Sequence, residues 1–238
     1  MQSPFANLTP VVKNLLIINI IFFVATFALA KVIDLDVLFA AFYPGSHFFR
    51  PWQPITYMFM HGGFEHIFFN LYALFIFGPL LEYALGSKRF FNYYFITGLG
   101  GYVLYMVVQA IQIHAITGAL SVPHPELQSS YYAYGGGQAV AQKLISLVNT
   151  PMLGASGAIF GILVGFGMLF PNLEMMIMFI PIPIKAKILV PIYIVVELFL
   201  GVKQVSGDSV AHFAHLGGAL FGFLLIKLWN IKRPNNFY

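Results

Sequence analysis

The chain has 238 residues, of which 59% are hydrophobic and only 8% are charged. Soluble domains carry about 25% charged residues, so this composition excludes an ordinary soluble domain and predicts a membrane protein with several spans. The net charge of +4 is small, and the absence of cysteine excludes disulfide bonds and thiolate metal sites.

The first half of the chain contains three apolar runs that match the roughly 20 residues needed to cross a bilayer. The first run covers about residues 14–33 and is rich in Ile and Phe. Residues 35–54 are interrupted by prolines and polar side chains, which argues against one spanning helix there. The second and third predicted spans are residues 66–85 and 90–113.

The second half of the chain begins with a long polar segment, residues 117–152, in which residues 140–148 have the pattern of an amphipathic surface helix. Three further apolar runs follow, at residues 153–169, 188–202 and 210–229. The first apolar run is too long for a cleavable secretory signal. We therefore predict one all-α membrane domain over residues 1–238, with six spans.

Positive charge is distributed unevenly between the predicted loops, and cytoplasmic loops of membrane proteins are enriched in Lys and Arg. Six spans place both termini on one side, so a cytoplasmic N-terminus puts eight basic residues inside and four outside. This ratio predicts cytoplasmic termini, with the starts of the second, fourth and sixth spans near the outer face. The inner residues are Lys13, Lys88, Arg89, Lys185, Lys187, Lys227, Lys232 and Arg233, and the outer ones are Lys31, Arg50, Lys143 and Lys203.

A serine and a histidine stand out within the apolar spans. Ser156 lies between the small residues Gly154 and Gly157 at the start of the fourth span, and His215 lies in the sixth. Polar groups in hydrocarbon are costly and tend to be functional. In the first turn of a helix, unpaired backbone N–H groups can stabilise an oxyanion. The pair therefore predicts a serine nucleophile with a histidine base.

Three pairs of residues four positions apart support one shared site, because such residues share a helix face. They are His66 with Asn70, Ser156 with Phe160, and Gly218 with Gly222. The last is a G-x-x-x-G pair, which favours close packing of two helices. Close packing of the fourth and sixth spans would bring His215 within hydrogen-bond reach of Ser156. A dyad then suffices, without a third carboxylate.

Over nearly its whole length the chain resembles the rhomboid family of intramembrane serine proteases. Four motifs carry the resemblance: Gly154-Ala155-Ser156-Gly157; Ala214-His215 with Gly218 and Gly222; H-x(4)-H-x(3)-N at His61, His66 and Asn70; and G-x(3)-E-x(3)-G at Gly78, Glu82 and Gly86.

The resemblance implies Ser156 as the nucleophile and His215 as the general base. It also implies an oxyanion hole formed by His66, Asn70 and the backbone N–H of Ser156. We expect the site to be packed by Phe160, Gly154, Gly157, His61, Gly218 and Gly222.

The chain departs from the family pattern at two positions. The family commonly has Trp-Arg in the first outer loop, whereas Gln53 follows Trp52 here, which weakens any arginine anchor. Phe160 stands where the family often has tyrosine, so the ring that packs on His215 is kept and the hydroxyl is lost. Glu197 is expected to extend toward the interface or to meet Lys203, outside the site.

Three other functions compete with an active protease. The first is a catalytically inactive rhomboid-like protein that binds membrane clients, which typically lacks one member of the Ser156–His215 pair. The second is a metal enzyme, but no H-E-x-x-H is present. The third is a transporter, for which we find no internal repeat. The metal enzyme would use His61, His66, His212 and His215.

The sequence therefore predicts a six-span rhomboid-like bundle that hydrolyses peptide bonds in or near transmembrane segments of membrane-protein substrates. Its expected partners are those substrates and the lipid bilayer, with no cofactor, no metal and no nucleic acid. We expect a multi-pass integral membrane protein of the bacterial plasma membrane, because a compact six-span form with no extra domain suits that membrane. The sequence assigns no oligomeric state.

Overall fold

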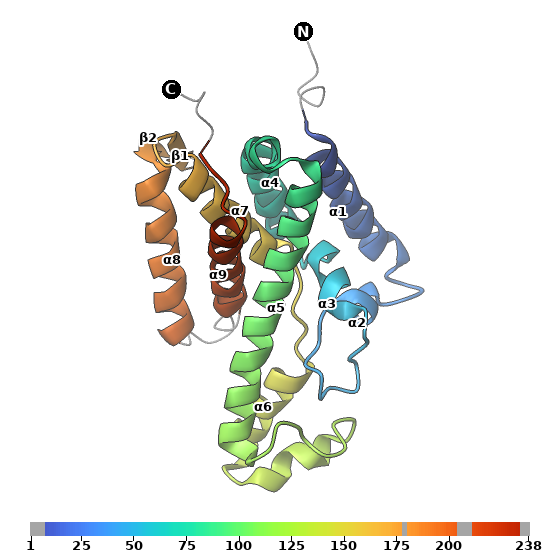
Figure 1. Cartoon of the computed structure of the whole chain (residues 1–238). Helices are drawn as coiled ribbons and strands as arrows, with labels where there is room; N and C mark the ends of the chain where they lie inside the picture. The colour runs from blue at the N-terminus through green and yellow to red at the C-terminus, as the bar shows by residue number, and fades with distance from the viewer. Residues whose placement is uncertain (1–7, 178–179, 204–210, 234–238) are drawn as a thin grey trace.

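A computed structural model describes residues 8–177, 180–203 and 211–233, and the described chain is all α apart from one small hairpin. The long helices run mainly along one direction (Figure 1), and α1 begins at the same end of the bundle at which α9 ends. These helices are α1 (Pro10–Leu29), α4 (Phe64–Leu85), α5 (Ser87–Thr117), α7 (Ser156–Leu169), α8 (Ala186–Lys203) and α9 (Ala211–Leu228).

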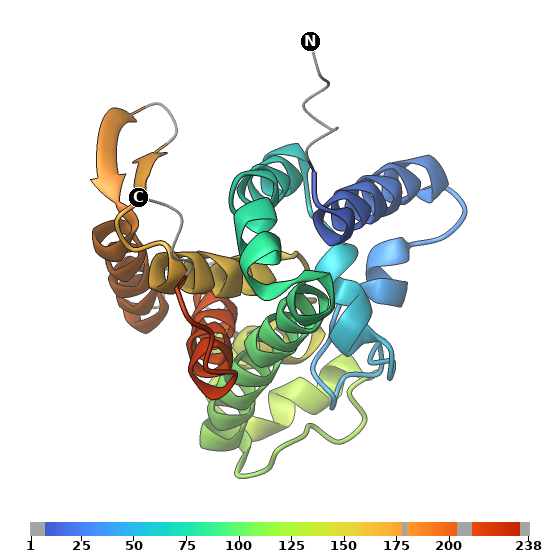
Figure 2. The same cartoon turned by 45° about the horizontal axis from the view of Figure 1, so that its top comes forward.

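Shorter elements connect the long helices. Figure 2 shows α1 to α3 on one side of the bundle and α8 with the hairpin on the other, with α5 between them. The hairpin, which the sequence did not predict, pairs β1 with β2 in antiparallel register, Glu174 opposite Lys185. The short elements are α2 (Leu35–Phe39), α3 (Gln53–Thr56), η2 (Tyr57–Phe59), η3 (Gln128–Tyr134), α6 (Gly137–Asn149), β1 (Glu174–Ile177) and β2 (Ile180–Lys185).

Each of the six predicted spans overlaps one long helix, although α1 ends at Leu29, four residues before the predicted end of the first span. Of the described helices, α1, α4 and α5 are long and apolar enough to cross a membrane by length and composition, and α7 and residues 212–228 are shorter apolar helices. The number of spans and the cytoplasmic side of the termini stay predictions. The amphipathic helix predicted at 140–148 is confirmed as α6, which is held to α5 by a hydrogen bond from the Gln109 side chain to the Leu147 carbonyl, 2.9 Å.

The start of α1 depends on Glu82 of α4. Its two carboxylate oxygens accept the backbone N–H groups of Val11 (3.1 Å) and Val12 (2.9 Å), and Ser87 donates its hydroxyl to the same carboxylate at 2.7 Å. A carboxylate at a helix N-terminus satisfies orphan N–H groups and complements the helix dipole. One turn earlier, Gly78 lets α1 approach, because a Cβ there would lie 2.7 Å from a Val12 methyl. This cap starts α1 four residues before the predicted span, at Pro10.

The segment between α1 and α4 is organised by Gln53, which is fully buried. Its amide nitrogen donates to the carbonyls of Val37 (3.2 Å) and Phe48 (3.0 Å), and its oxygen accepts from the backbone N–H groups of Phe42 (3.4 Å) and Arg50 (3.0 Å). An arginine has no acceptor and could not make the last two bonds. Gln53 therefore holds this segment by a different set of contacts from those of an arginine anchor.

Helices α5, α7 and α9 meet at glycines and form the centre of the bundle. A Cβ on Gly101 would lie 2.7 Å from the Ala214 carbonyl oxygen and 3.4 Å from the Gly157 Cα. A Cβ on Gly218 would collide with the Gly157 carbonyl, and one on Gly222 would lie 2.9 Å from Gly161. Small residues allow such close approach of helix backbones. The G-x-x-x-G pair of α9 thus lies directly against α7.

Candidate active site

Ser156 is the first residue of α7, and the loop before it is anchored by backbone hydrogen bonds. The Gly154 N–H donates to the Tyr57 carbonyl (3.0 Å), and Met152 exchanges two backbone bonds with Ala41 (2.7 and 2.8 Å). Gly154 has a φ of +117°, which L side chains rarely adopt. Because no side chain of the described residues caps α7, its first N–H groups are available to a ligand.

His215 of α9 lies against the face of α7 that carries Ser156. Its imidazole stacks on the ring of Phe160, with centroids 4.4 Å apart and planes 6° apart. Phe160 is one helical turn after Ser156 and therefore shares its face. The residue before His215 is also close to the residue after Ser156, since a Cβ on Gly157 would lie 3.5 Å from the Ala214 carbonyl oxygen. The fold thus brings the start of α7 and the first turns of α9 together.

The two nitrogens of His215 have different surroundings. Nδ1 lies 2.8 Å from a carboxylate oxygen of Glu197, and no hydrogen bond joins Ser156 to His215 among the described residues. A carboxylate only accepts, so Nδ1 carries the hydrogen and Nε2 keeps its lone pair. Hydrogen bonds of catalytic groups are often longer before substrate binds. Nε2 is therefore the nitrogen suited to accept a serine proton.

His66 and Asn70 of α4 lie beside the loop that leads into Ser156. A Cβ added to Gly154 would lie 2.6 Å from Nε2 of His66 and 3.8 Å from Nδ2 of Asn70. Nδ2 of Asn70 is buried and has no hydrogen-bond partner within the described residues. Leaving a buried donor unpaired costs about 1–3 kcal/mol. Such a donor beside Ser156 is suited to bind an oxygen atom that a ligand would bring.

His61 precedes α4 and is 2% exposed. Its ring meets that of His66 edge to face, with centroids 5.1 Å apart, and Nδ1 lies 3.3 Å from the Phe59 carbonyl oxygen. Burial and the neighbouring His66 lower the pKa of His61 to about 4. At neutral pH His61 is therefore uncharged and packs beneath His66.

The comparison with known families decides the relationship. A match to the Rhomboid domain covers residues 49–122 and 124–230, most of the chain. The chain belongs to the rhomboid family. Together with its apolar helices, this membership makes it an integral membrane protein.

Three curated relatives show the range of the similarity. The mitochondrial rhomboid protein 1 of Saccharomyces cerevisiae is 28% identical over 166 residues, 70% of this chain and 38% of the relative. An uncharacterized mitochondrial rhomboid protein of Schizosaccharomyces pombe is 27% identical over 204 residues, 76% of this chain and 52% of the relative. Rhomboid-like protease 3 of Toxoplasma gondii is 30% identical over 90 residues, 37% of this chain and 34% of the relative. The rhomboid described here thus spans about half, or less, of each relative.

Glu197 of α8 has a different environment from the expected one. Its Oε2 lies 2.8 Å from Nδ1 of His215 and 2.6 Å from Nδ1 of His212, rather than extending from the rhomboid bundle. The expectation that Glu197 stays outside the site is therefore wrong. Glu197 lies in the last two turns of α8, and the two histidines lie in the first turns of α9, the next helix in the chain. This nearness along the chain was a signal in the sequence that could have indicated the contact.

The metal alternative needed four histidines in one cluster, but the structure places them in two pairs. His61 contacts His66, and His212 contacts His215. The ring centroids are 5.1 Å apart in the first pair and 6.2 Å apart in the second. Within the described chain, the one group of three potential ligands is Glu197, His212 and His215. Tetrahedral zinc would hold neighbouring ligand atoms ~3.3 Å apart. Separations of 2.6 and 2.8 Å are those of charge-assisted hydrogen bonds.

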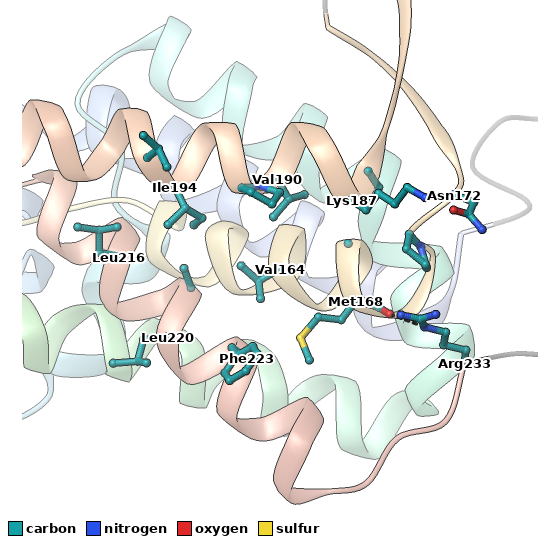
Figure 3. A pocket seen from close by; sticks show the side chains of 16 residues that line it. Val164, Met168, Asn172, Lys187, Val190, Ile194, Leu216, Leu220, Phe223 and Arg233 are labelled. Atoms are coloured by element: carbon teal, nitrogen blue, oxygen red, sulfur yellow. Dashed lines mark hydrogen bonds between the residues drawn. The ribbon is translucent and has the colours of Figure 1, made fainter.

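A hollow of about 900 Å³ lies between α7, α8 and α9 of the rhomboid. Its walls are mainly apolar, with Val164, Ile194 and Phe223 on the three helices and Arg233 at one end (Figure 3). None of Ser156, His215, His66 and Asn70 lines it. The hollow suits hydrocarbon and is separate from the groups that can do chemistry.

Proposed function

We propose that this rhomboid is a serine endopeptidase that hydrolyses peptide bonds in or near transmembrane segments of membrane proteins. The observation that carries the proposal is the position of His215, stacked on Phe160 one turn from Ser156, with Nδ1 bound and Nε2 left for the serine. The relative from Toxoplasma gondii, which is named as a protease, supports the same reaction class.

In the proposed reaction, Ser156 Oγ attacks the carbonyl carbon of the scissile bond while Nε2 of His215 takes its proton. The carbonyl oxygen becomes an oxyanion, stabilised by the Ser156 N–H and by the side chains of His66 and Asn70. The C–N bond then breaks, and the leaving amine takes the proton from His215. Water, activated by the same histidine, hydrolyses the acyl-enzyme and restores Ser156.

The proposal includes the predicted topology of six spans and cytoplasmic termini, which puts Ser156 in the outer half of the membrane. Water would then reach it through a polar opening near His66 and Asn70. A substrate helix must unwind locally to expose the scissile carbonyl, because its own hydrogen bonds bury that group. We propose that it enters between α4 and α8, and that the cut falls near small or helix-weakening residues.

The cellular membrane is a separate question from the chemistry. Two of the three relatives above are named as mitochondrial, which weighs against the bacterial plasma membrane expected from the sequence. We therefore propose a multi-pass integral membrane protein and assign it to no particular cellular membrane.

Labelling by a fluorophosphonate probe tests the proposal on the purified full chain in detergent. We expect stoichiometric labelling of Ser156, located by peptide mass spectrometry, that is lost in Ser156→Ala and strongly slowed in His215→Ala. The exposed Ser129 provides a matched control, so Ser129→Ala should label normally.

Two outcomes would contradict the protease. A folded wild-type protein that is never labelled would favour the inactive client-binding alternative. Cleavage activity that a chelator abolishes and zinc restores would favour a metal enzyme.

A further inference from the structure

Glu197 is a partly buried carboxylate that the proposed serine–histidine mechanism does not use. Its side chain is 14% exposed, and those of His212 and His215 are 12% and 18% exposed. An acidic group within an apolar helix is costly unless it is paired, and such groups are usually functional. Because this residue belongs to α8 and the two histidines to α9, the contact also joins the two helices.

The geometry defines the direction of the hydrogen bonds. One carboxylate oxygen, Oε2, accepts from Nδ1 of both His212 and His215, at 2.6 and 2.8 Å. These lengths are typical of bonds to an ionised carboxylate. Within the described residues, His212 and His215 are the titratable groups that act on Glu197. The carboxylate thus fixes both rings with hydrogen on Nδ1.

For His215 this tautomer is the productive one. With Nδ1 protonated, Nε2 presents a lone pair, which a general base needs in order to take the Ser156 proton. Phe160 restrains the plane of the same ring by stacking. The stack restricts tilting of the ring, and the hydrogen bond to Glu197 opposes a flip about χ2, which would exchange the positions of Nδ1 and Cδ2. The two contacts together define which nitrogen points away from α8.

We propose that Glu197 is a positioning residue of this protease: it holds His215 in the reactive tautomer and stabilises the imidazolium that forms when Ser156 gives up its proton. His212, as the second donor, holds the carboxylate in place. This inference rests on the proposed function, and it replaces the two-residue dyad expected from the sequence by a Ser156–His215–Glu197 arrangement. Glu197 itself keeps its charge throughout. In this it is like the aspartate of a serine-protease triad, which is not protonated during the reaction.

The test compares Glu197→Gln and Glu197→Asp with wild type in a liposome cleavage assay. Loss of an outer-shell partner costs ~10- to 100-fold, and loss of a triad carboxylate up to ~10⁴-fold. We expect Glu197→Gln to lower kcat by at least ~10-fold with KM nearly unchanged. Glu197→Asp, which keeps the carboxylate on a shorter side chain, should recover part of this loss. Glu174→Gln makes the same chemical change at an exposed position and should match wild type.

The split between kcat and KM, together with the rescue by Glu197→Asp, separates positioning from a purely structural role. Glu197→Gln keeps the size and shape of the side chain and removes its charge, so a role in packing alone would leave kcat unchanged. A positioning role needs the carboxylate, which Glu197→Asp retains. Unfolding midpoints, measured in the same detergent, establish that the compared variants are folded.

The outcomes separate this inference from the proposed function. Cleavage by Ser156→Ala at the wild-type rate would overturn the function and the inference together. If Ser156→Ala is inactive while Glu197→Gln keeps the wild-type kcat, only the role of Glu197 is overturned. Equal losses in Glu197→Gln and Glu197→Asp, or a higher kcat in Glu197→Gln, would also contradict the positioning role.

Discussion

The imidazole of His215 lies flat on the ring of Phe160, with the two planes only 6° apart and the centroids 4.4 Å apart. The contact joins α9 to α7 at the level of Ser156. A parallel contact of this kind holds the imidazole in one plane. The ring of Phe160 is therefore as much a part of the candidate site as the polar groups.

Phe160→Tyr should be tolerated, because the stacking ring is retained, whereas Phe160→Ala should lose activity. A displacement of the base by ~1 Å can cost on the order of 100-fold in rate. We expect kcat in a reconstituted cleavage assay to fall by that order in Phe160→Ala, with a smaller change in KM. Wild-type kcat in Phe160→Ala would show that the stack has no role in positioning His215.

Asn70→Ala should lower kcat by roughly 10- to 1,000-fold, as for the loss of one oxyanion-hole donor. It should do so without lowering the unfolding midpoint, because Nδ2 of Asn70 is buried without a described partner and its removal relieves that cost. His66→Ala should also reduce kcat. The exposed Asn92 supplies the control, Asn92→Ala, which should leave both quantities unchanged. An active Asn70→Ala would remove this residue from the proposed oxyanion hole.

Gly218→Val should reduce both activity and stability, because any Cβ there collides with the Gly157 carbonyl on α7. Overpacking typically costs about 1–3 kcal/mol, and separation of α9 from α7 would move His215 away from Ser156. Gly222→Val should act similarly, since its Cβ would lie 2.9 Å from Gly161. At the exposed Gly62 a Cβ would lie at an ordinary contact distance, 3.5 Å, from a Leu153 methyl, so Gly62→Ala should keep the wild-type unfolding midpoint. Unchanged midpoints in both valine variants would contradict the close contact of α7 and α9.

Acid should destabilise the protein partly through His61. Its pKa in the folded protein, about 4, lies below the ordinary value of 6.5 because the ring is buried. Between these two pH values the unfolded chain binds more protons than the folded one. The free energy of unfolding is therefore highest above pH ~6.5 and falls as the pH decreases toward ~4.

His61→Phe keeps a buried ring and removes this titration. The fall in unfolding midpoint from pH 7 to pH 5 should therefore be smaller in His61→Phe than in wild type, as measured by differential scanning fluorimetry in detergent. Identical pH dependence in the two proteins would mean that His61 does not titrate in this range on unfolding.

The sequence predicted those parts of the structure that local pattern controls. Apolar runs of sufficient length marked the six long helices, and the spacing of Ser156 and Phe160 put both on one helix face. The end of α5 was misjudged by four residues, because a left-handed Gly118, rather than a loss of apolar character, ends that helix. The candidate site residues other than Glu197 came from short motifs and the family resemblance.

The features that the sequence missed depend on contacts between distant residues. The start of α1 is set by Glu82, 71 positions after Val11. Glu197 is separated from His215 by 18 positions and belongs to another helix, and no local pattern specifies which way its side chain turns. Gln53 was noted as a missing arginine, whereas its four hydrogen bonds become evident only when the surrounding backbone is in place.

Cleavage of a generic transmembrane substrate by the full chain in liposomes, comparing wild type with Ser156→Ala, tests the central claim most directly. We predict that the wild type cuts the substrate near the outer end of its transmembrane segment. Ser156→Ala should give no product at equal protein concentration and with an unchanged unfolding midpoint. His215→Ala should be similarly inactive, and the double variant no worse than either single one, because the two residues act as a unit. Substantial turnover by purified, folded Ser156→Ala would contradict the serine mechanism.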